Sequence, residues 1–397
     1  MRNGIPPQSQ LLLPLLEELR DRGGCARPGE LYDRIAERLG ISADARTMTQ
    51  HAKNGKPINL YERQIRWTRQ TAVCKELIAG PERGLWELTD KARTSLRNAR
   101  RGTIVTVFET ERGVALWACA EDAVGVIDRE SVDLLLVSPP YPILRPREYG
   151  AIDERTWLDT MLRLCERWRA LLTPTGSMVL NVGTTWRSGM PAVSTYIHRF
   201  VVDMHDELGL HLCQDLYWYS PSKLPTPLEW LGVRRVRLKS SVEQLLWFSA
   251  DPANTKADNR RVLVPYSPSG RRSMREERDG KRPSGISFGP NSFARDNGGS
   301  IAPNLVIAAN AASNDAYHRA LRAASEKAHP ATMPMAVAEF AIAFLTERDD
   351  LVYDPMAGSL TTAKAAEKLE RRWIASERSL TYLRGGARRF PDARILA

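Results

Sequence analysis

The chain has 397 residues, and its 57 Lys and Arg against 47 Asp and Glu give a formal net charge of +10. Its 43% hydrophobic residues suffice for two or three folded domains, and no apolar run approaches the ~20 residues of a membrane span. Because its five cysteines stand singly, we expect no disulfide framework and a cytoplasmic location. Its six histidines form no HxxxH pattern, so we expect no zinc site. The basic charge suits a polyanionic partner.

Residues 1–101 carry 19 Lys and Arg against 12 Asp and Glu, a charge of +7. Apolar residues at helical spacing predict helices around 11–19 and 31–39, each stopped by glycine, and a third over about 60–78. The alternating run 85–89 predicts one strand of a hairpin. Three helices followed by a β-wing are the order of a winged helix.

Short sequence motifs in this segment are more specific than its pattern of helices and strand. The sequences Gly23-Gly24, Leu31–Ile35, Arg66-Trp67 and Arg83–Thr89 resemble the N-terminal domain of Mrr-type restriction proteins over most of residues 6–95. In that fold the third helix would present its arginines to a DNA groove or to phosphates: Arg63, Arg66 and Arg69. A solvated arginine-rich face, or a domain that only joins protomers, are the alternatives. The basic stretch 96–102 places the boundary between a winged-helix domain, residues 1–100, and a second domain, residues 101–397.

A nearly continuous apolar run, 131–137, predicts a strand buried on both faces of a parallel sheet. It ends in Ser138-Pro139-Pro140-Tyr141, where the prolines force the chain out of the sheet at the edge where α/β proteins bind ligands. The Ser138 hydroxyl and nearby carbonyls offer hydrogen-bond acceptors, and Tyr141 offers a flat face for stacking. Such a group suits the exocyclic amine of a flipped base. A proline turn beside a core tyrosine is the alternative.

A second block predicts a nucleotide-like ligand. The strand 351–353 runs into the turn 354–362, and a helix follows from about residue 361. This layout lets backbone amides approach an anionic or zwitterionic ligand. The next strand, 373–376, is closed by Glu377, where an acid can bind ribose hydroxyls.

Together these blocks resemble the amino-methyltransferases among the S-adenosylmethionine-dependent DNA methyltransferases, in the permuted β-class order. The resemblance covers roughly residues 103–397. It implies a Rossmann-like class I methyltransferase fold, an α/β sheet that is mostly parallel with one antiparallel strand. It makes Ser138, Pro139, Pro140 and Tyr141 the catalytic motif.

The resemblance also implies S-adenosylmethionine as cofactor. The implied cofactor residues lie in the turn, at the end of the next strand and in an HPAxxP-like block: Asp354, Pro355, Ala357, Gly358, Ser359, Thr361, Glu377, His329, Pro330 and Ala331. Leu360 stands where the family usually has Gly or Asn, and Leu would be strained there if the turn needs an unusual backbone angle. Either Glu121 or Asp122 is a candidate contact to the adenine.

The expected reaction is direct in-line methyl transfer to the N4 amine of a flipped cytosine in duplex DNA. Methylation at carbon-5 needs a cysteine that follows proline in that family, and no cysteine here does. Serine as the first motif residue is typical of N4-cytosine enzymes. The alternatives are an N6-adenine methyltransferase and a DNA-binding protein whose methyltransferase domain is inactive, with Leu360 as the suspicious residue.

Further helices and strands alternate over residues 156–250, where Asn181 could line the site or belong to the core. Between residues 251 and 300 periodicity fades, with 10 Lys and Arg against 6 Asp and Glu. An insert at about 251–325 is therefore the expected target-recognition region. Candidate DNA contacts are its basic residues and an earlier cluster: Arg260, Arg261, Arg271, Arg272, Arg275, Arg278, Lys281, Arg282, Arg234, Arg235, Arg237 and Lys239. The expected partner is double-stranded DNA in a bacterial cytoplasm, and a cognate restriction endonuclease and a homodimer stay open.

Overall fold

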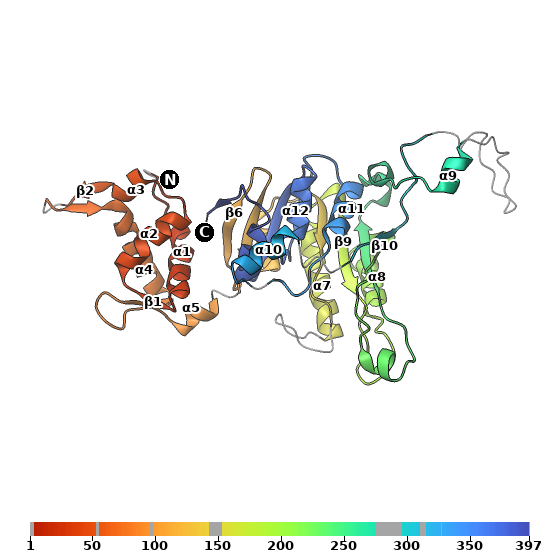
Figure 1. The fold of residues 1–397 in the computed structure, drawn as a ribbon, viewed down its shortest axis with the longest axis horizontal. Helices are drawn as coiled ribbons and strands as arrows, with labels where there is room; N and C mark the ends of the chain where they lie inside the picture. The colour runs from red at the N-terminus through yellow and green to blue at the C-terminus, as the bar shows by residue number, and fades with distance from the viewer. Residues whose placement is uncertain are drawn as a thin grey trace.

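The computed structural model describes residues 4–52, 55–95, 98–142, 153–274, 296–309, 315–326 and 328–396. A small N-terminal helical domain lies at one end and a large α/β domain at the other (Figure 1). None of the described helices is long and apolar enough to cross a membrane.

The N-terminal domain contains the three predicted helices and the wing. Its main elements are α1 (Gln8–Asp21), β1 (Cys25–Ala26), α2 (Pro28–Arg38), α4 (Leu60–Cys74), β4 (Ile78–Ala79) and β5 (Trp86–Leu88). Strand β5 pairs antiparallel with both β1 and β4. The third helix ends four residues earlier than expected, because Ile78 joins the wing. The sequence did not predict α3 (Ala43–Thr47), the hairpin β2 (Thr49–His51) and β3 (Pro57–Asn59), or α5 (Asp90–Ser95).

A buried ion cluster joins this domain to the α/β domain. Glu17 of α1 is fully buried and pairs with Arg384 of α13 (Leu380–Ala387) and, at 3.3 Å, with Arg38. The segment that links the two domains is also held in place, because the Ala99 amide donates to the Arg378 carbonyl at 2.7 Å. Removing the N-terminal domain would therefore leave the half-buried Arg384 of the second domain without its carboxylate partner.

The α/β domain is built on a ten-stranded sheet in the order β12-β10-β11-β9-β8-β13-β14-β7-β6-β15. Its strands are β6 (Ile104–Glu109), β7 (Gly113–Ala118), β8 (Val132–Val137), β9 (Leu172–Gly183), β10 (His211–Tyr219), β11 (Val242–Ser249), β12 (Leu305–Ile307), β13 (Leu351–Asp354), β14 (Arg372–Glu377) and β15 (Arg394–Ile395). The predicted α/β sheet, mostly parallel with an antiparallel strand, is confirmed. Strand β11 is that antiparallel strand, and β6 is a second one.

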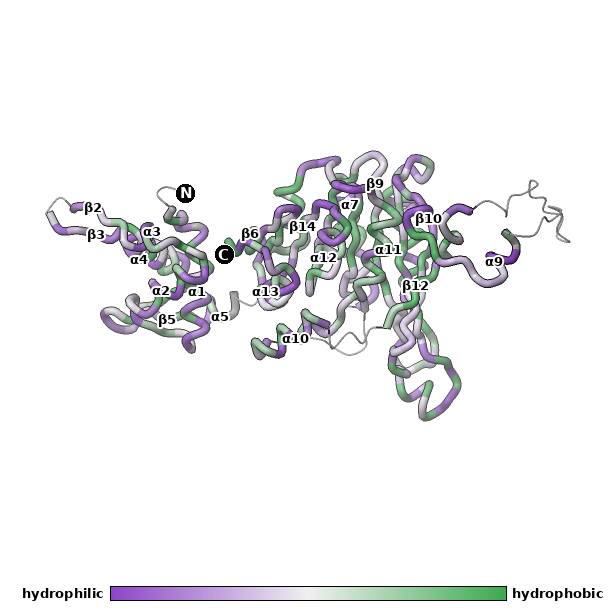
Figure 2. Tube along the Cα trace, turned by 45° about the horizontal axis from the view of Figure 1, so that its top comes forward, coloured by the Kyte–Doolittle hydropathy of each residue, from purple (hydrophilic) through white to green (hydrophobic). Residues whose placement is uncertain are grey.

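Helices cover both faces of the sheet (Figures 1 and 2). The described helical elements of this domain are α6 (Ala120–Ala123), α7 (Glu154–Arg169), α8 (Tyr196–Asp206), α9 (Pro268–Ser273), α10 (Ala316–Ala323), α11 (Met335–Leu345), α12 (Thr361–Lys368) and α13, with short turns at Val124–Val126, Glu229–Val233, Pro252–Asn254 and Asn259–Val262. In β8, Leu134 and Leu136 pack into the core shared with α11 and α12, whereas Leu135 and Val137 pack into the core shared with α7 and α8. This explains the continuous apolar run, because successive side chains of a strand point to opposite faces.

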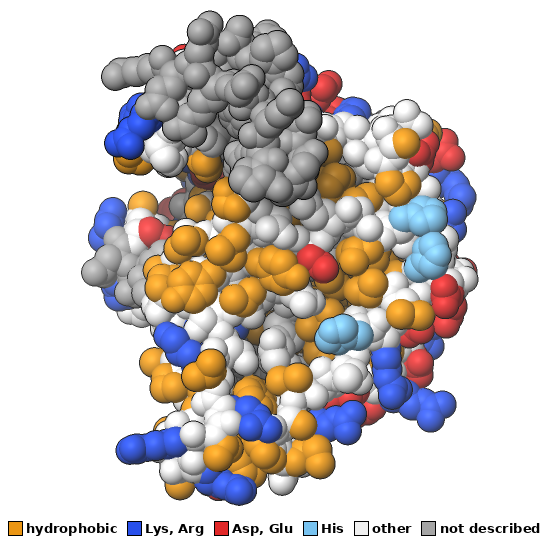
Figure 3. All heavy atoms as spheres, turned by 90° about the vertical axis from the view of Figure 1, so that its right-hand side faces the viewer, with side chains coloured by type: hydrophobic (Ala, Val, Ile, Leu, Met, Phe, Trp, Pro, Cys, Tyr) orange, Lys and Arg blue, Asp and Glu red, His pale blue; other side chains and the backbone are white. Residues whose placement is uncertain are grey.

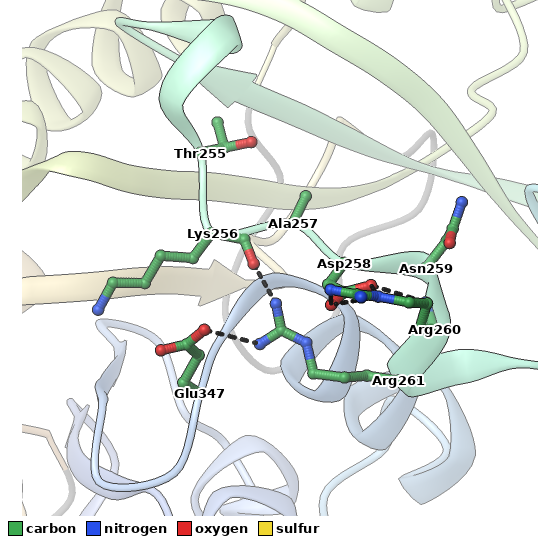
Figure 4. Close-up of a pocket in the computed structure, with 8 residues that line it drawn as sticks. All are labelled: Thr255, Lys256, Ala257, Asp258, Asn259, Arg260, Arg261 and Glu347. Atoms are coloured by element: carbon green, nitrogen blue, oxygen red, sulfur yellow. Dashed lines mark hydrogen bonds and ion pairs between the residues drawn. The ribbon is translucent and has the colours of Figure 1, made fainter.

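The first part of the expected recognition insert belongs to the scaffold. Lys256 Nζ lies 2.9 Å from Asp133 Oδ1 and 2.7 Å from Asp350 Oδ1, at the amino-terminal edge of the sheet. Arg261 donates to the carbonyls of Thr346 and Lys256, and Figure 4 shows the contact with Lys256. The Arg261 guanidinium therefore holds this corner together, and its contact with DNA stays a prediction.

Its neighbour Arg260 is exposed but paired with Asp258 through both carboxylate oxygens. It lines the same corner as Arg261 (Figure 4). The segment that carries Arg260 packs on the amino-terminal edge, and its contact with DNA stays a prediction.

Candidate functional site

Four neighbouring parallel strands, β8, β13, β14 and β7, end at one edge of the sheet. Their ends carry, in that order, Ser138, Asp354, Glu377 and the pair Glu121 and Asp122. The predicted catalytic turn and the predicted cofactor turn therefore lie side by side, although 216 residues separate Ser138 from Asp354. The carboxyl edge of such a sheet is where ligands bind.

The turn after β8 is held from behind by a tryptophan. Pro139 is buried, whereas Pro140 is exposed and Ser138 is half-buried. The Trp157 indole nitrogen of α7 donates to the Pro140 carbonyl at 2.7 Å. The sequence identified Trp157 only as helix core, since nothing local shows that its ring nitrogen reaches this turn.

Tyr141 lies against a glycine at the end of β9. A Cβ atom added to Gly183 would come within 2.7 Å of the Tyr141 ring. The Tyr196 hydroxyl donates to the Gly183 carbonyl at 2.5 Å and fixes this backbone. Gly183 thus provides the flat surface on which the tyrosine rests, and the sequence reading missed it despite the signal of a glycine closing a buried strand.

The structure decides the position of Asn181. Its side-chain nitrogen lies 3.3 Å from Ser138 Oγ and 3.2 Å from Glu243 Oε2. Only 2% of the residue is exposed. Asn181 therefore lines the site from within the core, which the sequence had left open.

Two carboxylates organise the second turn, Asp354, which is buried, and Glu377, which is half-buried. The Asp354 carboxylate accepts from the Met356 amide at 3.1 Å, and burial raises the pKa of Asp354 to about 7. The Glu377 carboxylate accepts from the amides of Gly358 at 2.8 Å and Ser379 at 2.7 Å, and burial also raises the pKa of Glu377. Two desolvated carboxylates at one edge favour a ligand that carries positive charge.

The raised pKa makes stability depend on pH. The ordinary pKa of Asp354 is 3.8, so its protonated form stabilises the folded chain at low pH and that stabilisation is lost as pH rises toward 7. Asp354→Asn stays neutral throughout. We expect the free energy of unfolding of the wild type to fall relative to this variant by about 2–3 kcal/mol between pH 5 and 8. Chemical denaturation without cofactor measures it, and a constant difference would contradict the buried, protonated carboxyl.

Leu360 adopts a left-handed backbone conformation, the kind of unusual angle at which we expected a leucine to be strained. Its φ is +60° and its ψ is 33° at the start of α12. The side chain is fully buried, and a Cβ on Gly386 would lie 2.7 Å from it. Burying a leucine contributes about 2–3 kcal/mol, which offsets a backbone cost of roughly 1–2 kcal/mol. The departure from the family pattern is therefore accommodated by packing.

The HPAxxP-like block reaches the same turn. Gly358 has a φ of +50°, and an added Cβ would lie 3.3 Å from the ring of His329. His329 also contacts Tyr382 edge to face at 4.4 Å, and its Nδ1 lies 2.6 Å from the Ala331 carbonyl. A side chain at position 358 would press tightly on the histidine and would be strained at this positive φ, so the position favours glycine.

The other predicted cofactor residues build the turn or border it. The Ala357 amide donates to the Ser376 carbonyl at 2.9 Å, and the Ser359 carbonyl accepts from Arg389 at 2.7 Å. The hydroxyls of Ser359 and Thr361 lie 3.2 Å apart. The carbonyl of Pro355 accepts from the Ser376 hydroxyl, whereas Pro330 and Ala331 are exposed beside His329.

The two candidate adenine contacts both lie beside the domain junction. Asp122 accepts from the Gly102 amide at 2.8 Å, and Glu121 pairs with Arg101 at 3.1 Å. Asp122 is the less exposed of the two, with 17% of its side chain accessible against 36% for Glu121.

The arginines of α4 do not share one surface. Arg63 lies over Trp67, which is 53% exposed, and Arg66 pairs with Glu62 at 2.6 Å. Arg69 is turned toward the wing, with its guanidinium 5.9 Å from the Trp86 ring. The outward face of α4 therefore presents Arg63, Arg66 and an exposed tryptophan that the sequence reading did not single out.

A lobe of residues 221–240 projects from the carboxyl end of β10, beside the Ser138 turn (Figures 1 and 3). Its base is closed by the Ser220 amide, which donates to the Ser241 carbonyl at 2.8 Å. Figure 3 shows hydrophobic and basic side chains gathered on it, and Leu228 and Leu238 are 64% and 90% exposed.

The basic residues of the lobe and of the insert differ in their contacts. In the lobe, Arg234 lies over Trp230, Arg235 is held to the Gly232 carbonyl at 3.4 Å, and Arg237 donates to the Pro191 carbonyl. Lys239 is exposed in the same lobe. Exposed cations of the insert lie on α9, at the far end of the molecule (Figure 1): Arg271 and Arg272. Four further candidates, Arg275, Arg278, Lys281 and Arg282, lie outside the described residues.

Comparison with known proteins gives two family matches. Residues 132–388 match the family model described as DNA methylase, and residues 9–98 match that of the Mrr N-terminal domain. The Type II methyltransferase M.PvuII of Proteus hauseri is 40% identical over 271 residues, 67% of this chain and 80% of the relative. M.BglII of Bacillus subtilis is 26% identical over 261 residues, 65% of this chain and 63% of the relative.

Among solved structures, one described as PvuII DNA methyltransferase (cytosine-N4-specific) is similar with a TM-score of 0.59. The sequence identity is 32%, and the similarity covers 73% of this chain and 91% of the other. It spans the α/β fold that places the two turns at one edge.

Proposed function

The chain belongs to the DNA methylase family, and on that premise we propose that it methylates the N4 amine of a cytosine at a specific site in duplex DNA. The observation that carries the proposal is the meeting of the Ser138 turn and the Asp354 turn on adjacent strands. The serine of the motif and the cytosine-N4-specific relative support cytosine rather than adenine. Both resemblances read from the sequence, to the DNA amino-methyltransferases and to the Mrr N-terminal domain, are confirmed.

The family uses S-adenosylmethionine, and the second turn fits it. This cofactor supplies a methyl group on a positively charged sulfur. We propose that Asp354 organises the turn, that Glu377 binds the ribose, and that Gly358 with His329 forms the close-packed wall beside it. The fit rests on two carboxylates whose pKa burial raises and on a glycine with a positive φ that lies tightly against His329.

In the proposed mechanism the chain orients the amine and needs no strong base. Ser138 Oγ and the Pro139 carbonyl accept the hydrogens of the amine, so that its nitrogen lone pair faces the methyl group. Tyr141 stacks on the base and helps exclude water. The new N–C bond forms as the S–C bond breaks, and the amine loses one proton after transfer. Positioning of this kind is the main contribution an enzyme makes to such a displacement.

We propose that residues 1–100 are a DNA-binding winged helix and that residues 101–397 are the methyltransferase domain. Within the insert at about 251–325, we assign target recognition to the residues that follow Arg261, because the segment up to Arg261 packs against the sheet. Lobe and insert cations, among them Arg234, Arg235, Arg271 and Arg272, would contact phosphates. The same proposal implies a cognate restriction endonuclease and a cytoplasmic location. The mass of the purified chain in solution tests whether it forms a homodimer.

The winged helix can be tested by point variants, which leave the buried pair of Glu17 and Arg384 intact. Replacing Arg63 and Arg66 together by Ala should weaken duplex binding roughly 10-fold and lower the salt slope by about 0.9 for each phosphate that is no longer neutralised. Arg348→Ala, at the amino-terminal edge of the sheet, is the matched control. Titration of duplex DNA at several salt concentrations measures both, and an unchanged slope would show that α4 does not contact phosphates.

Base mapping in DNA from cells that express the chain tests the function as a whole. The expected product is N4-methylcytosine in one short sequence. N6-methyladenine would keep the mechanism and change the base. Absence of both would favour a DNA-binding protein without turnover, although the packing of Leu360 removes the main reason for that alternative.

A further inference from the structure

The lobe of residues 221–240 carries an apolar surface that no described part of the chain covers (Figure 3). Its exposed apolar side chains are Leu224, Leu228, Val233, Val236 and Leu238. Leu238 is 90% exposed, the largest fraction of any large apolar side chain among the described residues. The same lobe has five Lys and Arg against one acid, Glu229. A surface that is both apolar and basic suits a polyanion that also offers apolar area.

The backbone on either side of Leu238 is held in place. Just before it, Arg237 Nε donates to the Pro191 carbonyl at 2.8 Å. Just after it, Lys239 Nζ donates to the Lys223 carbonyl at 3.4 Å. The lobe therefore presents this leucine to solvent from an ordered segment, so that a partner which buries it pays little conformational entropy.

The second exposed leucine differs in its contacts. Leu228 packs on the backbone of the lobe itself, because a Cβ added to Gly232 would lie 2.5 Å from its side chain. Leu228 is 64% exposed, against 90% for Leu238. We therefore assign Leu228 to the support of the lobe, and Leu238 to the contact with a partner.

Side-chain contacts join the lobe to the Ser138 turn. Lys223 Nζ lies 2.8 Å from Glu243 Oε1, and Glu243 Oε2 lies 3.2 Å from the side-chain nitrogen of Asn181. That nitrogen is 3.3 Å from Ser138 Oγ. Strand β10, from which the lobe projects, runs parallel to β8, so both segments leave the sheet at one edge. A duplex whose cytosine reaches Ser138 therefore passes beside the lobe.

Duplex DNA fits this surface better than a second copy of the chain. In a symmetric contact between two copies, the basic lobe would face its own positive charge. A duplex instead offers phosphates to the cations and base faces to an apolar side chain. Turning a base out of the helix unstacks its neighbours, and apolar wedges of DNA-bending proteins enter such opened steps.

We propose that Leu238 is an apolar wedge, which enters the base stack beside the target cytosine and stabilises the duplex after that base has turned out. Arg234 and Arg235 hold the phosphates on either side of the opened step. This inference rests on the proposed function, and it adds a residue that favours the flipped state of the substrate without touching the reacting amine.

Leu238→Ala tests the wedge on duplexes that carry the sequence found by base mapping. On a fully paired duplex, single-turnover methylation should slow roughly 10-fold, because nothing replaces the lost stacking. On a duplex with an abasic site opposite the target cytosine, pairing is already lost, and the variant should stay within about 2-fold of the wild type. Leu238→Met keeps an apolar side chain of similar volume and should retain most of the rate on both.

Two further measurements separate insertion from loss of charge or of structure. The salt slope of duplex binding should be unchanged in Leu238→Ala, because leucine neutralises no phosphate. The affinity for S-adenosylmethionine should stay within about 2-fold of the wild type, since the cofactor turn is intact. Val202→Ala is the matched control, because Val202 is 55% exposed on α8, outside the lobe.

The outcomes distinguish the wedge from the proposed function. A wild type that methylates no base rejects the proposed function, and the wedge with it. If the wild type is active, a Leu238→Ala variant that is equally fast on the paired duplex, or equally slowed on both duplexes, overturns the wedge alone. A wild-type dimer that becomes a monomer in Leu238→Ala would overturn it as well, because the apolar surface would then join two copies of the chain.

Discussion

Replacing Ser138 by Ala should lower the rate of methyl transfer at least about 100-fold, with the affinity for S-adenosylmethionine nearly unchanged. The hydroxyl is the side-chain acceptor at the start of the motif, and it receives a hydrogen bond from Asn181 at 3.3 Å. Without it the amine is no longer held with its lone pair toward the methyl group. Single-turnover incorporation of a labelled methyl group into duplex DNA measures the rate, and calorimetry measures cofactor affinity.

Tyr141→Ala should have a comparable effect for a different reason. Its ring rests on Gly183 and supplies the stacking surface for the base. Tyr141→Phe is the matched control, since it keeps the ring and should retain most of the rate. Near-normal rates in both Ser138→Ala and Tyr141→Ala would refute the assignment of this turn as the catalytic one.

Asp354→Ala should weaken cofactor binding by roughly 10- to 100-fold. The carboxylate accepts from the Met356 amide at 3.1 Å and is 5% exposed, so its removal leaves the turn before α12 without the group that shapes it. Above the Asp354 pKa of about 7, the variant also removes a negative charge that would attract a positively charged cofactor. Isothermal titration of the cofactor into the purified chain measures the change.

Two comparisons make this result interpretable. Asp354→Asn keeps an acceptor without the charge, so an intermediate affinity would separate shape from electrostatics. Ser138→Ala should bind the cofactor as the wild type does. If Asp354→Ala folds, as judged by its unfolding transition, and binds the cofactor with unchanged affinity, the turn is not the cofactor site.

The local sequence pattern determined much of this protein's secondary structure and the position of its two turns. Strand β8, the two turns and the helix α12 were all predicted from the sequence, because burial on both faces produces a continuous apolar run and because proline and small residues mark where a chain must leave a sheet. The winged helix followed from apolar spacing and glycine stops. Even the strain at Leu360 was foreseeable, since a side chain at a left-handed position departs from what the turn favours.

Tertiary structure alone decided which distant residues serve the site. Trp157, Gly183 and Glu243 reach the Ser138 turn because β9 and β11 are the next strands along the sheet, and no periodicity records strand order. Arg261 is a further example: its basic side chain suggested a DNA contact, and only the tertiary structure shows that it packs at the amino-terminal edge of the sheet. The sequence pattern indicates whether a residue is buried, because burial repeats with the local period of a helix or strand. Which residues a buried side chain contacts depends on the order and register of the strands. Contacts between residues distant along the chain determine both.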